Sequence, residues 1–197
     1  MAVHRFDATI REIQTLTPSV KHYTLLAPSE FSFKPGQFVV LSVPNPSGKL
    51  VKRSYSVASA PKTGEAFTIK DERKPIVLVG TGTGVAPFRS MVADVLSRGF
   101  GKKILLLCGY RFEDEILYDR EFSHLAKLHG NFDYHPVVSR PRPGYKGEIG
   151  RVQQLIEAHA KDMNADFYLC GLTEMIEDVK KLLEAKGAKR IFFERYD

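Results

Sequence analysis

The sequence predicts two domains, a small antiparallel β-barrel followed by an α/β domain with a five-stranded parallel sheet. Short strand-like segments alternate with turns rich in proline and glycine over residues 1–72. After that point apolar strands alternate with amphipathic helices, the pattern of βαβ units. A glycine-rich turn at residues 80–84 joins the first of these strands to a helix. We therefore expect one domain over residues 1–72 and a second over residues 73–197.

The expected barrel is small, with about five strands separated by turn residues. Lys34-Pro35-Gly36 and the run from Pro44 to Gly48 are two of these turns. The expected strands cover residues 3–15, 20–27, 37–43, 51–58 and 66–70. A barrel of this size leaves one edge unpaired, and an unpaired edge can add a strand from another molecule. A homodimer is therefore a candidate assembly.

The second domain has clear strand and helix signals. Its expected strands cover residues 76–79, 104–108, 132–138, 167–170 and 190–193. A helix that begins at Pro87 carries an apolar stripe at helical spacing and stops at Arg98-Gly99. A later helix over residues 173–186 has Thr173 as its expected N-cap and Gly187 after its end. Its methionine and leucine residues, Met175 among them, form an apolar stripe typical of a core-facing helix.

The turn after the first parallel strand is typical of a phosphate-binding loop. Glycines stand at positions 80, 82 and 84, and glycine lets the backbone approach a ligand closely. The first turn of the following helix offers free N–H groups and the positive end of the helix dipole. The spacing differs from G-x-G-x-x-G, and no acidic residue follows about 20 residues later to bind a ribose hydroxyl. A tight turn that serves packing alone is the alternative interpretation.

Four strand ends are expected to meet at one edge of the parallel sheet. Ligands of open parallel sheets bind outside the carboxyl ends of the strands. The segments at this edge are 80–84, 109–111, 139–140 and 171–172. Arg111 and Arg140 lie among them, and a guanidinium group can hold a phosphate through two parallel hydrogen bonds. Solvated surface arginines are the alternative.

The net charge and the composition indicate which classes of partner the protein can bind. The net charge of +6 and the pI of about 9.3 suit an anionic partner, such as a nucleotide or an acidic protein. The basic residues are dispersed and come with no nucleic-acid-binding motif, so no nucleic-acid partner is expected. No apolar run reaches the roughly 20 residues of a membrane helix and no signal-peptide core begins the chain, so we expect a cytoplasmic protein without membrane contact.

The cysteine and histidine residues indicate neither a disulfide framework nor a metal site. Cys108 and Cys170 are too few for a disulfide framework, and burial as a small apolar residue is the expected role of Cys108. No metal site is expected, because the histidines are not paired at metal-ligand spacing. They are His4, His22, His124, His129, His135 and His159.

Five short motifs together resemble the ferredoxin-NADP reductase superfamily of flavoproteins. In chain order they are Pro35-Gly36-Gln37-Phe38, the R-x-Y-S motif Arg53-Ser54-Tyr55-Ser56, the glycine turn 80–87, Cys170-Gly171, and Glu194-Arg195-Tyr196. Each motif is weak alone, but their order over nearly the whole chain is specific.

The resemblance implies a flavin-binding barrel followed by an NAD(P)-binding domain, with the two cofactor rings stacked between them. Tyr55 would then pack on the flavin ring, Ser56 would hydrogen-bond near its N5, and Arg53 would hold the flavin phosphate. Tyr196 resembles the terminal aromatic residue that covers the flavin until nicotinamide displaces it. The expected catalytic residues are Ser56, Cys170 and Glu194. The expected cofactor-binding residues are Arg53, Ser54, Tyr55, Ser56, Lys70, Thr81, Gly82, Thr83, Gly84, Pro87, Arg111, Ser139, Arg140, Gly171, Leu172, Met175 and Tyr196.

The chain departs from the family pattern between two of the motifs. Only residues 57–79 separate Ser56 from Gly80, where relatives hold several tens of residues more, including an element on the flavin pyrophosphate. The expected flavin is FAD, with FMN as the alternative. The loss of this element leaves three outcomes open: FAD held weakly or by a second chain, FMN or riboflavin in its place, or no flavin. The expected nucleotide is NADP rather than NAD, because Ser139-Arg140 resembles the family's segment near the adenosine phosphate and no acid ends the strand before Arg111.

The leading function is therefore a flavin-dependent NAD(P)H oxidoreductase that exchanges electrons with an acidic carrier such as ferredoxin or flavodoxin. An NAD(P)H:flavin reductase that uses free flavin as its substrate is one alternative. An electron-transfer component of a larger complex is the other.

Overall fold

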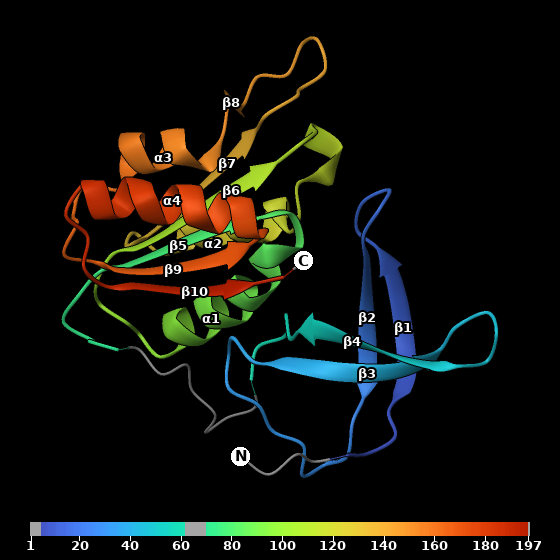
Figure 1. Cartoon of the computed structure of the whole chain (residues 1–197). Coiled ribbons are helices and arrows are strands. Elements are labelled where there is room, and N and C mark those ends of the chain that lie inside the picture. The colour runs from blue at the N-terminus through green and yellow to red at the C-terminus, as the bar shows by residue number, and fades with distance from the viewer. Residues whose placement is uncertain (1–4, 62–69, 197) are drawn as a thin grey trace.

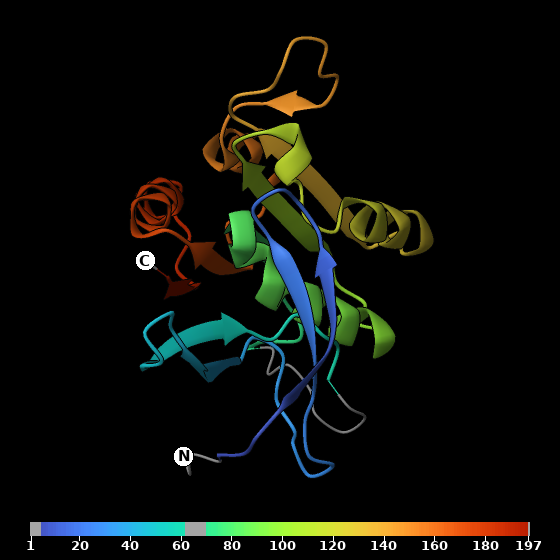
Figure 2. The same ribbon diagram turned by 90° about the vertical axis from the view of Figure 1, so that its right-hand side faces the viewer.

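The computed structural model describes residues 5–61 and 70–196, and its elements follow the predicted order. Antiparallel strands come first, and a parallel sheet with helices on both faces follows (Figures 1 and 2). The predicted fold class is confirmed.

The N-terminal strands form two hairpins. Strand β1 (Thr9–Thr15) pairs with β2 (Lys21–Leu26), and β3 (Phe38–Pro44) pairs with β4 (Leu50–Ser56). In the second turn, the Asn45 side-chain oxygen accepts hydrogen bonds from the N–H groups of Ser47 (3.1 Å) and Lys49 (2.9 Å). The four described strands of this N-terminal part thus lie in two separate two-stranded sheets. Of the predicted strand 66–70, residues 66–69 lie outside the described part of the chain.

The parallel sheet holds six strands, one more than predicted. In spatial order they are β10 (Ile191–Arg195), β9 (Asp166–Gly171), β5 (Ile76–Thr81), β6 (Ile104–Tyr110), β7 (Phe132–Val138) and β8 (Glu148–Ile149). The extra strand β8 has two residues, which is too short to produce a hydrophobic period in the sequence.

Helices cover both faces of the sheet (Figures 1 and 2). They are α1 (Val85–Ser97), α2 (Asp119–Leu128), α3 (Val152–His159) and α4 (Thr173–Ala185), with short 3₁₀ helices η1 (Gly82–Gly84) and η2 (Glu113–Glu115). Two predicted helix starts need correction. Helix α1 begins at Val85 rather than Pro87 because the 3₁₀ turn runs directly into it, and Leu172 rather than Thr173 is the N-cap of α4.

Alternate residues of the central strand belong to two different cores. Ile76 and Leu78 pack with helices α1 and α2, whereas Val77 and Val79 pack with α3 and α4. Such alternation follows from the two-residue period of a strand. Because both faces are covered, strands β5, β6 and β9 are apolar and buried almost throughout.

The N-terminal hairpins contact the α/β part through helix α1. The Arg89 guanidinium donates a hydrogen bond to the carbonyl oxygen of Ala58 (2.9 Å) and lies 4.9 Å above the ring of Tyr118. Gly36 approaches Met91 so closely that a Cβ there would lie 2.5 Å from the methionine Cε. Helix α1 therefore contacts both the parallel sheet and the loops of the hairpins.

Large apolar side chains remain exposed on the hairpins and, at Phe6, just before the first of them. They are Phe6, Ile10, Ile13, Tyr23, Leu26, Phe38, Val40, Val43, Leu50 and Tyr55. Among residues 5–61 and 70–196, no helix is both long enough and apolar enough to cross a bilayer.

Candidate functional site

The glycine turn after β5 presents the start of helix α1 at the carboxyl edge of the sheet. Gly82 has φ +52°, a left-handed conformation that favours glycine. Gly84 lies against β9, and a Cβ on it would overlap the carbonyl oxygen of Cys170. Among the residues that the structure describes, none provides a side-chain N-cap for helix α1, and the first turn of the helix contains no acidic residue. Its first N–H groups and dipole therefore favour an anion.

Strand register brings Cys170 and Glu194 next to this turn. Cys170 on β9 is opposite Gly80 on β5 and opposite Glu194 on β10. Gly80 is in turn opposite Cys108 on β6. One cross-strand row therefore joins the glycine turn to both residues that the sequence predicts to border the reaction.

Burial shifts the pKa values of the ionisable side chains in this row. It raises the pKa of the Cys170 thiol to about 12, with a smaller contribution from the nearby Glu194 carboxylate. Burial also raises the pKa of Glu194 above its ordinary value. At neutral pH Cys170 is a neutral thiol, which suits a group that packs against a ligand rather than a nucleophile. Cys108 is fully buried, as predicted, and burial raises its thiol pKa as well.

Tyr196 binds the glycine turn. Its hydroxyl donates a hydrogen bond to the carbonyl oxygen of Thr81 (2.6 Å) and accepts one from the N–H of Gly84 (3.0 Å). Its own N–H donates to the carbonyl oxygen of Gly171 at 3.3 Å. The resemblance places this ring over a flavin. In the structure, the hydroxyl of this ring hydrogen-bonds to two backbone groups of the glycine turn, and the stacking of the ring on a flavin stays a prediction.

The turn after β9 packs against the glycine turn. A Cβ on Gly171 would lie 2.6 Å from the Thr81 hydroxyl oxygen and would overlap the Met175 side chain. Met175 is partly buried and packs against the core under α4, whereas Leu172 is 55% exposed. The absence of a side chain at positions 84 and 171 thus allows the two turns to pack closely against each other.

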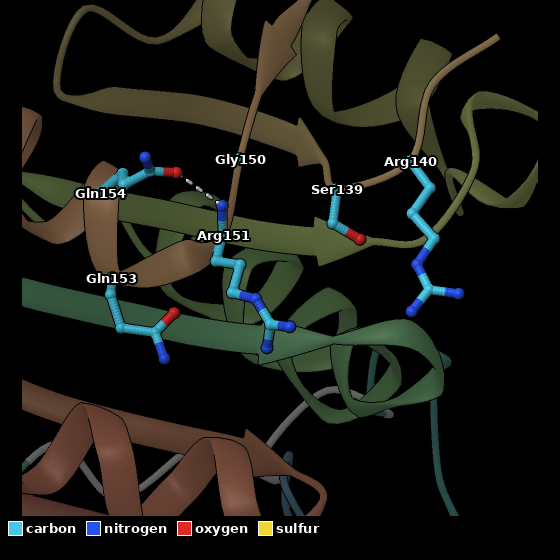
Figure 3. Close-up of a pocket in the computed structure, with 6 residues that line it drawn as sticks. All are labelled: Ser139, Arg140, Gly150, Arg151, Gln153 and Gln154. Atoms are coloured by element: carbon cyan, nitrogen blue, oxygen red, sulfur yellow. Dashed lines mark hydrogen bonds between the residues drawn. The ribbon is translucent and has the colours of Figure 1, made fainter.

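A second part of the same sheet edge forms a basic pocket of about 390 Å³ at the ends of β7 and β8. It is lined by Ser139, Arg140, Gly150, Arg151, Gln153 and Gln154 (Figure 3). Figure 3 shows the side chains of Arg140 and Arg151 on either side of Ser139. The Gln153 side-chain oxygen is buried and has no hydrogen-bond partner among the described residues. Within the part of the chain that the structure describes, no acidic residue lines the pocket.

Backbone contacts hold this pocket in place. The Arg140 N–H donates to the carbonyl oxygen of Arg111 (2.8 Å), and the Ser139 hydroxyl donates to that of Tyr110 (3.3 Å). The Arg151 N–H donates to the Gln154 side chain (2.8 Å) at the start of α3. The predicted residues Ser139 and Arg140 thus line the pocket, and the exposed Arg111 lies beside it.

Three of the lining residues, Arg151, Gln153 and Gln154, are not among the residues predicted from the sequence. The available signal was a glycine followed by an amphipathic helix, Gly150 and then residues 152–159, with polar residues in its first turn. That signal indicates a helix start. Only the pairing of β8 with β7 shows that this helix start faces Arg140.

The predicted flavin-side residues remain together on β4. Arg53 and Tyr55 alternate with Ser54 and Ser56, so each pair shares one side of the strand. Tyr55 is 48% exposed, and the Arg53 guanidinium donates to the carbonyl oxygen of Lys52 (2.9 Å). Lys70 lies at the start of the second described segment, with its ammonium group 5.8 Å from the ring centre of Phe192 on β10. Pro87 is buried within α1.

Comparison with known proteins agrees with the architecture. The family model for the oxidoreductase NAD-binding domain matches residues 78–181. The chain is 28% identical to ferredoxin--NADP reductase B of Sorangium cellulosum, over 98% of both chains. That alignment runs over 243 positions against 197 residues here, so the relative holds segments that this chain lacks.

Two further comparisons differ in how much of the other protein they cover. The toluate 1,2-dioxygenase electron transfer component of Pseudomonas putida is 26% identical over 97% of this chain but only 67% of its own length. The crystal structure of a ferredoxin NADP+ reductase from Neisseria gonorrhoeae with bound FAD and NADP superposes with a TM-score of 0.79. It covers 97% of this chain and 99% of its own, at 20% identity. With the family model matching over half of the chain, the protein belongs to the ferredoxin-NADP reductase superfamily, as an oxidoreductase with an NAD-binding domain.

Proposed function

We propose that the chain is a flavin-dependent NADPH oxidoreductase that passes electrons to an acidic one-electron carrier such as ferredoxin or flavodoxin. The observation that carries the proposal is the shared sheet edge, with an anion-binding glycine turn at one part and a basic pocket at another. We propose residues 1–72 as the flavin-binding part and residues 73–197 as the nucleotide-binding part. The net charge of +6 favours an acidic partner.

The proposed nucleotide lies along the edge of the parallel sheet. The N–H groups that begin α1 bind its pyrophosphate, as helix N-termini bind anions elsewhere. Arg140 and Arg151 bind the 2′-phosphate, and the unpartnered oxygen of Gln153 accepts a hydrogen bond from the adenine amino group. A pocket with two arginines and, among the described residues, no carboxylate favours NADPH over NADH.

The proposed reaction site is the row formed by Cys170 and Glu194. When bound, the flavin supplies the two-electron and one-electron chemistry. The neutral Cys170 thiol packs against the nicotinamide without reacting. The carboxyl group of Glu194 belongs to the residue opposite Cys170 on the neighbouring strand β10. Tyr196 excludes water from the turn until the nucleotide replaces it. Arg53, Tyr55 and Ser56 are proposed to hold the flavin, FAD rather than FMN.

Anaerobic titration of the flavin-loaded protein tests this function. NADPH is expected to bleach the flavin absorption at lower concentration than NADH, and the reduced protein is expected to reduce ferricyanide and ferredoxin. Failure to bind FAD or FMN, or absence of NADPH oxidation with flavin and ferricyanide supplied, would contradict the proposal. The second of these results would favour a catalytically silent component of a larger complex.

A flavin reductase that releases its flavin is the second candidate. The 48% exposure of Tyr55 and the two separate hairpins favour it, because these strands form little of an enclosed flavin site.

The exposed apolar side chains of the hairpins support a homodimer in which a second copy covers them. Gel filtration with light scattering tests both ideas. Flavin retained by a dimer supports the bound-cofactor enzyme, and a colourless monomer supports the reductase of free flavin.

Tyr196→Phe tests the role of the hydroxyl at the glycine turn. The variant keeps the ring but removes the group that binds Gly84 and Thr81. Each hydrogen bond contributes roughly 0.5–1.5 kcal/mol, so the Kd for NADPH is expected to fall about tenfold. Tyr23→Phe, on an exposed hairpin position, is the control and should leave the Kd unchanged. Equal affinity of Tyr196→Phe and the parent protein would show that the hydroxyl does not compete with the nucleotide.

A further inference from the structure

Two histidines and one glutamate converge on the far edge of the parallel sheet. His135 lies on β7, Glu148 on β8, and His159 is the last residue of α3. The Nδ1 atom of His135 lies 3.2 Å from Oε1 of Glu148, and Nε2 of His159 lies 3.6 Å from the same oxygen. All three potential ligand atoms lie within 4.8 Å of one another. Sequence spacing predicts no metal site, whereas the fold brings these three side chains together.

The spacing of these atoms matches the edge of a tetrahedral zinc site. Zinc binds imidazole nitrogen and carboxylate oxygen at about 2.0–2.2 Å, which places neighbouring ligand atoms of a tetrahedral ion about 3.4 Å apart. The observed separations of 3.2 and 3.6 Å lie on either side of that value. Three protein ligands leave a fourth position for water, which is common at zinc sites of this kind.

The side chains have room to adopt ligand geometry. The imidazole rings are stacked, with centres 3.6 Å apart and planes 21° apart, so one ring must turn to direct its lone pair at a shared ion. The torsion between Cβ and an aromatic ring is broad and turns at low cost. The side chains of His135 and His159 are 26% and 28% exposed, and that of Glu148 is 46% exposed. The cluster is therefore open to solvent and to an entering ion.

We propose that His135, Glu148 and His159 bind one Zn²⁺ ion that links β7, β8 and α3. The ion would hold β8 in place, because β8 pairs with β7 over only two residues whereas β7 and α3 pack firmly in the α/β part. Imidazole and carboxylate ligands in this combination suit zinc and do not suit Mg²⁺. Gly150 and Arg151 follow β8 directly and line the basic pocket, so the ion would also fix one wall of that pocket. The proposal does not depend on the proposed function.

Zinc titration of the full chain without a histidine tag tests the proposal, by competition with a chromophoric chelator. We expect one Zn²⁺ per chain in the parent protein and no competition from excess Mg²⁺. His135→Gln and His159→Gln are each expected to weaken zinc binding at least about tenfold, since even the loss of a group that only orients a ligand weakens metal affinity about 10–100-fold. His124→Gln, at an exposed position on α2, is the matched control and should bind zinc like the parent. Equal zinc affinity in all three variants, or no binding by the parent, would overturn the proposal.

Nuclear magnetic resonance of the histidine ring nitrogens gives a second measurement that needs no variant. Zinc is expected to shift the ring nitrogen signals of His135 and His159 together at one equivalent, and to leave those of His124 unchanged. If zinc shifts other histidines and leaves this pair unchanged, the ion binds elsewhere and the proposal fails.

Discussion

Gly84→Ala is expected to lower both the stability of the protein and its rate of NADPH oxidation. Gly84 has φ −62° and ψ −10°, a conformation that alanine adopts without strain. With no clash, such a replacement would stabilise the protein slightly. The new Cβ would instead overlap the carbonyl oxygen of Cys170, a backbone atom within the parallel sheet. The effect of the substitution is therefore steric.

The expected loss is about 1–3 kcal/mol in the free energy of unfolding, the usual cost of overpacking. The rate of NADPH oxidation is expected to fall by about 100-fold, because the turn must move away from β9 and a misplacement on the order of 1 Å has that effect on catalysis. Denaturant unfolding and steady-state kinetics measure the two quantities.

Gly101→Ala is the control for the Gly84 substitution. Gly101 has an ordinary φ and open space around the position of a Cβ. Its replacement is expected to change the free energy of unfolding by less than about 0.5 kcal/mol. If Gly84→Ala behaves like Gly101→Ala, the glycine turn does not depend on close contact with β9.

Arg151→Ala and Arg140→Ala are each expected to weaken NADPH binding about 10- to 100-fold while changing NADH binding by less than about threefold. A hydrogen bond to a charged group contributes about 1.5–3 kcal/mol, and only NADPH carries the 2′-phosphate that these guanidinium groups are proposed to bind. Titration of each variant with both nucleotides measures the ratio of the two Kd values.

Arg120→Ala removes the same charge from an exposed position on α2 and is the matched control. It is expected to affect NADPH and NADH equally and slightly, through the general field of the protein. If Arg140→Ala and Arg151→Ala also weaken both nucleotides equally, the pocket does not bind the 2′-phosphate.

The carboxyl edge of the sheet could be predicted from local patterns. Apolar runs at strand length, amphipathic helices between them and the glycine turn define the βαβ order. Parallel strands must then bring Gly80, Cys170 and Glu194 to one edge. Register places them in a single row across neighbouring strands.

Three features of the molecule, two at the candidate site and one at the histidine cluster, depend on contacts between segments separated in sequence. Tyr196 reaches Thr81 across 115 positions of the sequence. Arg151 joins Arg140 only because two residues of β8 pair with β7. His135 and His159 come together at Glu148 for the same reason. No periodicity or motif marks a two-residue strand or the partner of a terminal hydroxyl.

By itself, the sequence determined the family, the order of the elements and the position of the glycine turn, because these depend on local periodicity, on glycine conformation and on short motifs. The tertiary structure alone decided which side chains complete the basic pocket, what binds the glycine turn, and where two histidines meet a glutamate. The physical reason is that such contacts depend on strand order and register. Both arise from burial of the whole sheet between two layers of helices.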